Sequence, residues 1–230
     1  MMPGLIAFVV VTVVHLFGQA SAPGGALTDI TQVLIVPALA WVLLAGTPTP
    51  KSRLVRLVLA ALVLSWLGDS LPRLTPDGSE IGFYLMVVPF LLAQFAYIAA
   101  FLPFASRSVV RDIPILTVYV LIWLVVLAIF TIGGGGIVAS VVYGSAVVAM
   151  AVLATGIDLV AGIGGALFVV SDALVGMHAF LQVDLPLHGL WVMLTYALAQ
   201  VFIVLAVARR DRLDADEPAA EHRPDLHPQV

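Results

Sequence analysis

Eight apolar stretches, each about as long as a membrane-spanning helix, constrain the fold of this 230-residue chain more than any other feature. A helix needs about 20 mostly apolar residues to cross the hydrocarbon core of a bilayer. The stretches cover residues 3–19, 28–46, 54–71, 81–104, 113–132, 136–155, 159–180 and 187–208. They are continuous runs without the period-two alternation of a transmembrane β-barrel. The sequence therefore predicts an all-α polytopic membrane protein with eight transmembrane helices.

The composition supports a membrane protein and argues against several other classes. Apolar residues make up 62% of the chain and charged residues only 10%, whereas soluble domains have about 45–50% and about 25%. A soluble enzyme, a nucleic-acid-binding protein and a disordered chain are therefore not expected. The chain has no cysteine, which excludes disulfides, thiolate metal ligands and a cysteine nucleophile. Membrane lipids are the expected surroundings, and no nucleic-acid partner is expected.

The basic residues predict the orientation of the helices. If the N-terminus is cytoplasmic, the inner surface receives nine of the ten basic residues: Lys51, Arg53, Arg56, Arg107, Arg111, Arg209, Arg210, Arg212 and Arg223. Only Arg73 falls on the outer side, which matches the positive-inside rule. We therefore expect both termini in the cytoplasm. The excess of arginine over lysine, with helices rich in Ala, Val and Gly, indicates a bacterial plasma membrane.

The first and sixth stretches each leave an alternative open. The first resembles a signal peptide in having Ala20-Ser21-Ala22 as a possible cleavage site, although no positive charge precedes it. The sixth has a glycine-rich start and could form a re-entrant segment. After residue 210 the chain becomes acidic and contains Pro and His. We expect a membrane domain over residues 1–210 and a disordered acidic tail over residues 211–230.

Asp69 and Asp172 are the main carboxylic acids within the predicted spans. An ionisable side chain inside a span costs several kcal/mol, so it usually faces the interior of the helix bundle and serves a function. Both helices run outward, and each aspartate lies about 22–24 Å from the inner end of its helix at about 1.5 Å per residue. Their matched depth allows them to share one cavity. Separate capping or interhelical hydrogen bonds are the structural alternative.

Other polar side chains in the spans are candidates for lining such a cavity. They are His15, Asp29, Gln32, Gln94, Tyr97, Ser171, Tyr196 and Gln200. Hydrogen bonding between helices, or an N-cap at Asp29, explains the same residues without a binding function. The sequence contains no phosphate-binding glycine loop, Ser-His-Asp motif or zinc-ligand spacing that stands out. We therefore predict neither a metal site nor a cofactor.

Several short segments together resemble the YhhN family of integral-membrane lysoplasmalogenases. The strongest is the run from Gly165 to Asp172, which is similar to the family segment G-x-x-x-F-x-x-S-D. The others are Leu67-Gly68-Asp69, Tyr97-Ile98-Ala99-Ala100-Phe101 and Thr195-Tyr196-Ala197-Leu198-Ala199-Gln200. These segments fall in the third, fourth, seventh and eighth stretches, so the resemblance covers residues 28–208.

The resemblance implies an activity and a mechanism. Such enzymes cleave the vinyl-ether bond of a lysoplasmalogen, which releases a fatty aldehyde and glycerophosphocholine or glycerophosphoethanolamine. Asp69 and Asp172 would form the acid–base pair, with the eight polar residues around a lysophospholipid substrate and no cofactor. The chain differs from many members at Gln94, where a histidine is frequent, and at Gln32, where a lysine is frequent. Glutamine can hydrogen-bond a substrate, but it supplies neither a charge nor a titratable proton.

Two other functions fit the same residues. Buried carboxylic acids also relay protons, so a small transporter or proton-coupled permease is the main alternative. No inverted repeat or matching pair of broken helices supports it. A non-catalytic lysolipid-binding protein is the other alternative, and Gln32 and Gln94 are compatible with it. The sequence leaves the headgroup, the chain length and the oligomeric state open.

Overall fold

The computed structural model describes residues 1–76, 78–132 and 136–221, with side chains described as far as residue 216. Within these ranges every element is helical: α1 (Met2–Ser21), α2 (Ala26–Gly46), α3 (Arg53–Ser70), η1 (Leu71–Leu74), α4 (Glu80–Phe101), η2 (Leu102–Arg107), η3 (Val109–Arg111), α5 (Ile113–Ile132), α6 (Ile137–Ala154), α7 (Leu159–Gly176), η4 (Met177–Leu181) and α8 (His188–Glu221). Eight helices in the described residues are long and apolar enough to cross a membrane. This confirms the predicted fold class.

Local sequence signals explain where several helices begin and end. Ser52 and Asp158 are N-caps whose side chains accept hydrogen bonds from Val55 N at 3.2 Å and Ala161 N at 2.8 Å. α4 ends at Phe101, earlier than the predicted residue 104. Pro103 explains the early end, because it has no N–H for the next helical hydrogen bond. The chain continues there as the short 3-10 segment η2.

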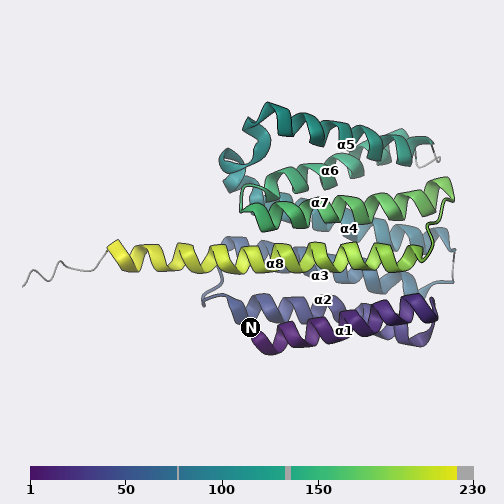
Figure 1. Ribbon diagram of the computed structural model, residues 1–230, viewed down its shortest axis with the longest axis horizontal. Coiled ribbons are helices and arrows are strands. Elements are labelled where there is room, and N and C mark those ends of the chain that lie inside the picture. The colour runs from purple at the N-terminus through teal and green to yellow at the C-terminus, as the bar shows by residue number, and fades with distance from the viewer. Residues whose placement is uncertain (77, 133–135, 222–230) are drawn as a thin grey trace, which may run out of the picture.

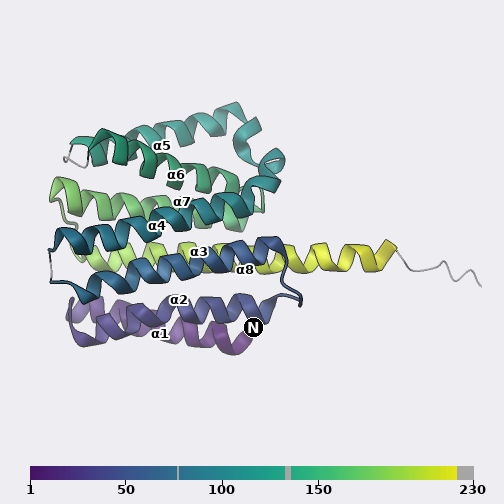
Figure 2. The ribbon, with the colours of Figure 1, turned by 180° about the vertical axis from the view of Figure 1, so that it is seen from behind.

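The helices form two layers that share one core (Figures 1 and 2). α1, α8 and α7 lie on the face seen in Figure 1, and α2, α3 and α4 lie on the opposite face in Figure 2. α5 and α6 close one edge of the bundle. α5 is the least buried of these spans, with 11% of its most apolar segment buried inside the bundle. The polar residues that need shelter from lipid are therefore expected between the two layers.

Small residues allow α7 to pack closely against its neighbours. A Cβ atom added at Gly165 would lie 2.7 Å from Ala151 Cα in α6, and one added at Gly164 would lie 2.9 Å from Ala199 O in α8. Both distances are too short for a real side chain, so glycine is required by the close approach of the backbones. α7, which carries Asp172, is thereby held against both α6 and α8.

The connections divide the bundle into two ends. The α2–α3, α4–α5 and α6–α7 connections lie at the end where the N-terminus begins and where α8 leaves the bundle (Figure 1). We call it the basic end, because the basic residues of these connections and of α8 gather there. Arg73 follows α3 at the opposite end, which we call the Arg73 end. The positive-inside rule predicts that the basic end is cytoplasmic.

α8 continues well beyond the predicted end of the last span. The described helix reaches Glu221, so residues 211–221 are helical in the structure, although we expected disorder from residue 211 onward. A helix already formed in the bundle propagates without a new nucleation step. The Arg210–Asp214 pair, with a 2.8 Å contact at i,i+4 spacing, favours this extension. The rest of the predicted tail, residues 222–230, lies outside the described residues.

Candidate active site

A cavity of about 320 Å³ lies between the two layers, toward the Arg73 end. Its walls come from α4, α6, α7, η4 and α8, with single contributions from α2, α3 and α5. Most lining side chains are apolar, including Phe83, Met86, Val87, Phe90 and Phe130. The volume lies at the lower end of the range for small-molecule sites, about 300–1,000 Å³. The cavity thus offers apolar surroundings with a few polar groups.

Asp69 and Asp172 both line this cavity. Asp69 comes from the last turn of α3, and Asp172 comes from the half of α7 nearer the Arg73 end. Their side chains belong to residues that are only 6% and 8% exposed. The matched depths allowed the two aspartates to share a cavity, and both line this one. Two carboxyl groups from separate helices are therefore part of the wall of the same small cavity.

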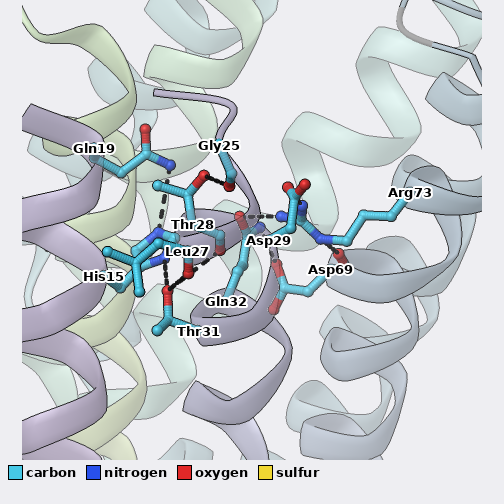
Figure 3. Close-up of polar contacts among 10 residues, drawn as sticks. All are labelled: His15, Gln19, Gly25, Leu27, Thr28, Asp29, Thr31, Gln32, Asp69 and Arg73. Carbon is cyan, nitrogen blue, oxygen red and sulfur yellow. Dashed lines mark hydrogen bonds and ion pairs between the residues drawn. The ribbon is translucent and has the colours of Figure 1, made fainter. Parts of the chain in front are cut away.

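Asp69 accepts two hydrogen bonds from side chains on other helices. Tyr196 in α8 donates its hydroxyl to Oδ2 at 2.8 Å, and Gln32 in α2 donates its amide to Oδ1 at 3.2 Å. Figure 3 shows Gln32 and Asp69 side by side. Each donor occupies a lone pair on a different carboxylate oxygen, so the orientation of the carboxylate is fixed. Asp69 is therefore held at the junction of α2, α3 and α8.

Asp172 has a simpler environment. Tyr143 in α6 donates its hydroxyl to Asp172 Oδ2 at 3.1 Å. The preceding residue, Ser171, donates to the backbone carbonyl of Val192 at 3.1 Å and ties α7 to α8. Ser171, Asp172 and Tyr143 all line the cavity. The two aspartates thus share a cavity but have different hydrogen-bond partners, with more donors around Asp69.

Arg73 extends the polar contacts of Asp69 toward the Arg73 end of the bundle (Figure 3). Its guanidinium donates to the Asp29 carboxylate, to Gln32 Oε1 and, at 3.1 Å, to the backbone carbonyl of Asp69. Gln32 therefore accepts from Arg73 through its oxygen while its nitrogen donates to Asp69. This fixes the orientation of the Gln32 amide and links one positive charge to the Asp69 site.

Aromatic side chains hold the two tyrosines in place. Tyr196 packs edge-to-face against Phe90 and Phe168, with ring centroids 5.8 Å apart in both pairs. Tyr143 packs against Phe130 with centroids 5.9 Å apart. Edge-to-face pairs are worth about 0.5–1.5 kcal/mol beyond the burial of their area. The hydroxyl groups that meet the aspartates are therefore carried on rings with little freedom to move.

Two of the predicted polar residues, Tyr97 and Gln200, form a buried layer with Ser65 on the basic-end side of the cavity. Tyr97 donates its hydroxyl to Gln200 Oε1 at 2.5 Å, and Gln200 donates its amide to Ser65 Oγ at 3.2 Å. The layer lies one helical turn from the site, because Ser65 precedes Asp69 and Gln200 follows Tyr196 by four residues. The side-chain amide of Gln94, also fully buried, has no hydrogen-bond partner within the described residues.

The predicted binding residues therefore separate into two groups. Gln32, Ser171 and Tyr196 line the cavity together with Asp69 and Asp172. His15, Asp29, Gln94, Tyr97 and Gln200 are not among the residues that line it. His15 lies between α1 and α2, where its Nδ1 is 2.9 Å from Thr31 Oγ1 (Figure 3). For these five residues contact with a substrate stays a prediction. The hydrogen bonds of His15, Asp29, Tyr97 and Gln200 join different helices or helical segments.

Sequence reasoning overlooked two residues that contact the site. Tyr143 lies in a strongly apolar helix, where a tyrosine gives no signal of the carboxylate that it meets. Arg73 was identified only as the basic residue on the outer side, and its i,i+4 spacing from Asp69 was the available signal. That spacing places it one turn beyond the aspartate on the same side of the helix.

The comparison with known families agrees with this membrane domain. The family model described as the YhhN family matches residues 27–207, which run from the start of α2 to the part of α8 inside the bundle. No curated protein and no solved structure matches the chain significantly. The matched region includes Gln32, Asp69, Tyr143, Asp172 and Tyr196. The chain therefore belongs to the YhhN family.

Proposed function

We propose that this protein is a membrane hydrolase that cleaves the vinyl-ether bond of lysoplasmalogens. The observation that carries the proposal is the pair of buried carboxyl groups, Asp69 and Asp172, in the wall of one mostly apolar cavity. The resemblance of the segments around them to lysoplasmalogenases supplies the reaction. We further propose that the protein acts in the plasma membrane of a bacterium, with its basic end in the cytoplasm.

The lining of the cavity suits a single-chain lipid. Phenylalanine, methionine and valine side chains from α4 and α8 surround the alkenyl chain near its reacting end. The rest of the chain continues among the exposed apolar faces of the helices, which meet lipid. The polar part of the substrate lies toward Gln32 and Asp69, where hydrogen-bond donors are available. Binding would thus bring the vinyl ether between the two carboxyl groups.

The reaction needs one proton donor and one proton acceptor. A carboxylic acid protonates the enol-ether carbon that is not bonded to oxygen, and the other vinyl carbon becomes part of an oxocarbenium ion. A water molecule adds to that carbon and gives a proton to the second carboxylate. The hemiacetal then collapses to the aldehyde: the carboxylate that gave the first proton takes the hemiacetal hydroxyl proton, the carbon–oxygen bond to glycerol breaks, and the second carboxyl group gives its proton to the glycerol oxygen. One water is consumed, and both carboxyl groups return to their starting states.

The hydrogen bonds favour one assignment of the two roles. Asp69 accepts bonds from Gln32 and Tyr196 and has the charge of Arg73 nearby, which together stabilise a carboxylate. Asp172 accepts one hydrogen bond, from Tyr143, and has fewer groups to stabilise a negative charge. In our proposal Asp172 therefore protonates the vinyl ether, and Asp69 takes the proton from water. Two carboxyl groups in different environments are a recurrent way to separate acid from base.

Product analysis with purified protein tests the proposal. The detergent-solubilised protein is incubated with lysoplasmenylcholine or lysoplasmenylethanolamine, and with the matched alkyl-ether and acyl lysolipids. We expect aldehyde and the glycerophospho product from the vinyl ethers only, because an alkyl ether cannot form the oxocarbenium ion by protonation. In D₂O the aldehyde should carry one deuterium on the carbon next to the carbonyl. Absence of aldehyde from both vinyl ethers would contradict the proposal.

Variants connect the activity to the two aspartates. Asp69→Asn and Asp172→Asn should each lower aldehyde release by at least about a hundredfold, in line with the usual contribution of acid–base catalysis. Asp112→Asn is the matched control, since Asp112 Oδ1 accepts from Ile115 N as a helix cap and asparagine caps equally well. Full activity in both site variants would refute the mechanism. Lipid or proton flux through proteoliposomes without any product would instead favour a transporter.

A further inference from the structure

Arg73 is a positive charge beside a cavity whose other ionisable groups are acids. The remaining arginines and the lysine lie in the connections at the basic end, in the first turn of α3 at that end, or in the C-terminal part of the chain. Arg73 instead follows α3 at the end where the cavity lies. Its three contacts, to Asp29, Gln32 and the Asp69 carbonyl, hold the guanidinium next to the Asp69 site (Figure 3). Such a charge is suited to an anionic part of a ligand.

The spacing between Arg73 and Asp69 matches the spacing within a lysophospholipid. The Gln32 amide bridges the Asp69 carboxylate, at 3.2 Å, and the Arg73 guanidinium, so the two charged groups lie within about 8 Å of each other. In a lysoplasmalogen, the glycerol carbons and one ester oxygen separate the ether oxygen from the phosphorus, which amounts to about 6 Å at ordinary bond lengths. A lipid whose ether lies at Asp69 therefore has its phosphate at Arg73.

In the structure the Asp29 carboxylate is paired with the Arg73 guanidinium. The two side chains form an ion pair, and their exposed fractions are 25% for Arg73 and 51% for Asp29. A half-exposed ion pair contributes little to stability, about 0–1 kcal/mol, so exchanging its carboxylate for another anion is inexpensive. A phosphate has the oxygen geometry that a guanidinium binds with two parallel hydrogen bonds. Asp29 is thus positioned to compete with a phosphate for the same donors.

We propose that Arg73 binds the phosphate of a single-chain lysophospholipid and that Asp29 is the internal anion that this phosphate displaces. The inference rests on the proposed function for the identity of the lipid, and it names the part of the substrate that the positive charge recognises. Gln32 remains bonded to Asp69 while Arg73 exchanges its partner. Arg73 would then hold the phosphate at one end of the Arg73–Gln32–Asp69 contacts, with the vinyl ether at Asp69 at the other end. Together these two contacts would fix the position of the substrate along the cavity.

The first test measures binding without catalysis. The thermal unfolding temperature of the purified protein in nanodiscs is followed during titration with lysophosphatidylcholine or with monoacylglycerol of the same chain, which lacks the phosphate. We expect lysophosphatidylcholine to bind at least about tenfold more tightly, in line with the loss of a charge-assisted hydrogen bond. Arg73→Gln should remove this difference. Arg107→Gln, the same charge change at an exposed site on the basic end, should retain it.

Asp29→Asn provides a variant with the opposite expected effect. Removing the competing carboxylate should tighten lysophosphatidylcholine binding several-fold and leave monoacylglycerol binding unchanged. This result does not depend on Arg73→Gln being stably folded. Equal affinities for the two lipids in the unaltered protein, or weaker phospholipid binding in Asp29→Asn, would overturn the proposal.

Additional ligands distinguish the sources of a phosphate. Inorganic phosphate and glycerophosphocholine, which lack the chain, should not raise the unfolding temperature at concentrations where lysophosphatidylcholine does. An equal response to inorganic phosphate would show a general anion site and overturn the assignment to a lipid. Hydrolysis is measured separately, with lysoplasmenylcholine and 1-alkenylglycerol. If neither compound is cleaved, the proposed function is refuted, whereas the binding titrations still decide the role of Arg73.

Discussion

Tyr196 Oη lies 2.8 Å from Asp69 Oδ2 and donates a hydrogen bond to it from a helix 127 residues further along the chain. The two residues join α8 to α3 at the wall of the cavity. Both are buried, at 4% and 6% exposure. The hydroxyl therefore bonds the carboxylate without competition from bulk water. Removing it should lower the rate of the proposed hydrolysis.

Tyr196→Phe keeps the ring and its contacts with Phe90 and Phe168 but removes the donor to Asp69. A hydrogen bond to a charged group is worth about 1.5–3 kcal/mol, so we expect kcat/KM for aldehyde release to fall about 10- to 100-fold. Steady-state kinetics with a lysoplasmalogen measures the change. Tyr119→Phe in α5, outside the residues that line the cavity, is the control. Unchanged kcat/KM in Tyr196→Phe would show that Asp69 does not depend on this donor.

Tyr143→Phe tests the corresponding contact of Asp172. The hydroxyl donates at 3.1 Å, and we expect a smaller loss of kcat/KM than in Tyr196→Phe if Asp172 is the acid. The reason is that a protonated carboxyl group needs less stabilisation from a donor than a carboxylate does. A double variant with Asp172→Asn should be no less active than Asp172→Asn alone. A larger loss in Tyr143→Phe than in Tyr196→Phe would reverse the assignment of acid and base.

Tyr97→Phe separates packing from substrate binding in the buried layer. It removes the donor to Gln200 Oε1 and leaves that acceptor buried without its partner. We expect the free energy of unfolding to fall by about 1–3 kcal/mol, with KM changed less than twofold. Urea unfolding followed by tryptophan fluorescence, together with kinetics, gives both quantities. A KM raised tenfold at unchanged stability would instead place Tyr97 in contact with the substrate.

Gly165→Ala tests the close packing of α7 against α6. The new Cβ would lie 2.7 Å from Ala151 Cα, which is backbone and cannot move aside alone. Overpacking of this kind costs about 1–3 kcal/mol, so we expect a lower thermal unfolding temperature. Gly144→Ala is the matched control, because its Cβ would meet Val126 Cγ1 at an ordinary 3.4 Å. Equal unfolding temperatures for the two variants would contradict the close approach.

The spans could be predicted closely because the bilayer dictates helix length. Hydropathy predicted residues 113–132 for the fifth span, and α5 has these same bounds. The C-terminal end of α8 could not be predicted in this way, because residues 211–221 lie beyond the apolar run. There, helix propagation and the Arg210–Asp214 pair decide the structure, and hydropathy does not report either.

The two aspartates could be predicted to face the interior of the bundle, because exposing a carboxyl group to lipid costs several kcal/mol. Their matched depth made a common cavity a reasonable expectation. The sequence did not distinguish which hydroxyl and amide side chains line the cavity and which only bond to neighbouring helices. Gln32 lines the cavity, whereas Tyr97 and Gln200 bond to each other outside its lining. The difference depends on the rotation of each helix about its axis, which a nearly uniform apolar sequence does not specify. For the same reason the sequence did not identify Tyr143 as a residue of the site.

The long-range contacts of Asp69 have a consequence for biosynthesis. Asp69 enters the membrane with α3, but its partner Tyr196 is carried by α8 and is synthesised more than a hundred residues later. Until then the early helices hold an acid without its principal hydroxyl donor. A nascent or truncated chain that lacks the last helix therefore lacks this contact, and insertion of that helix is the step that completes the candidate site.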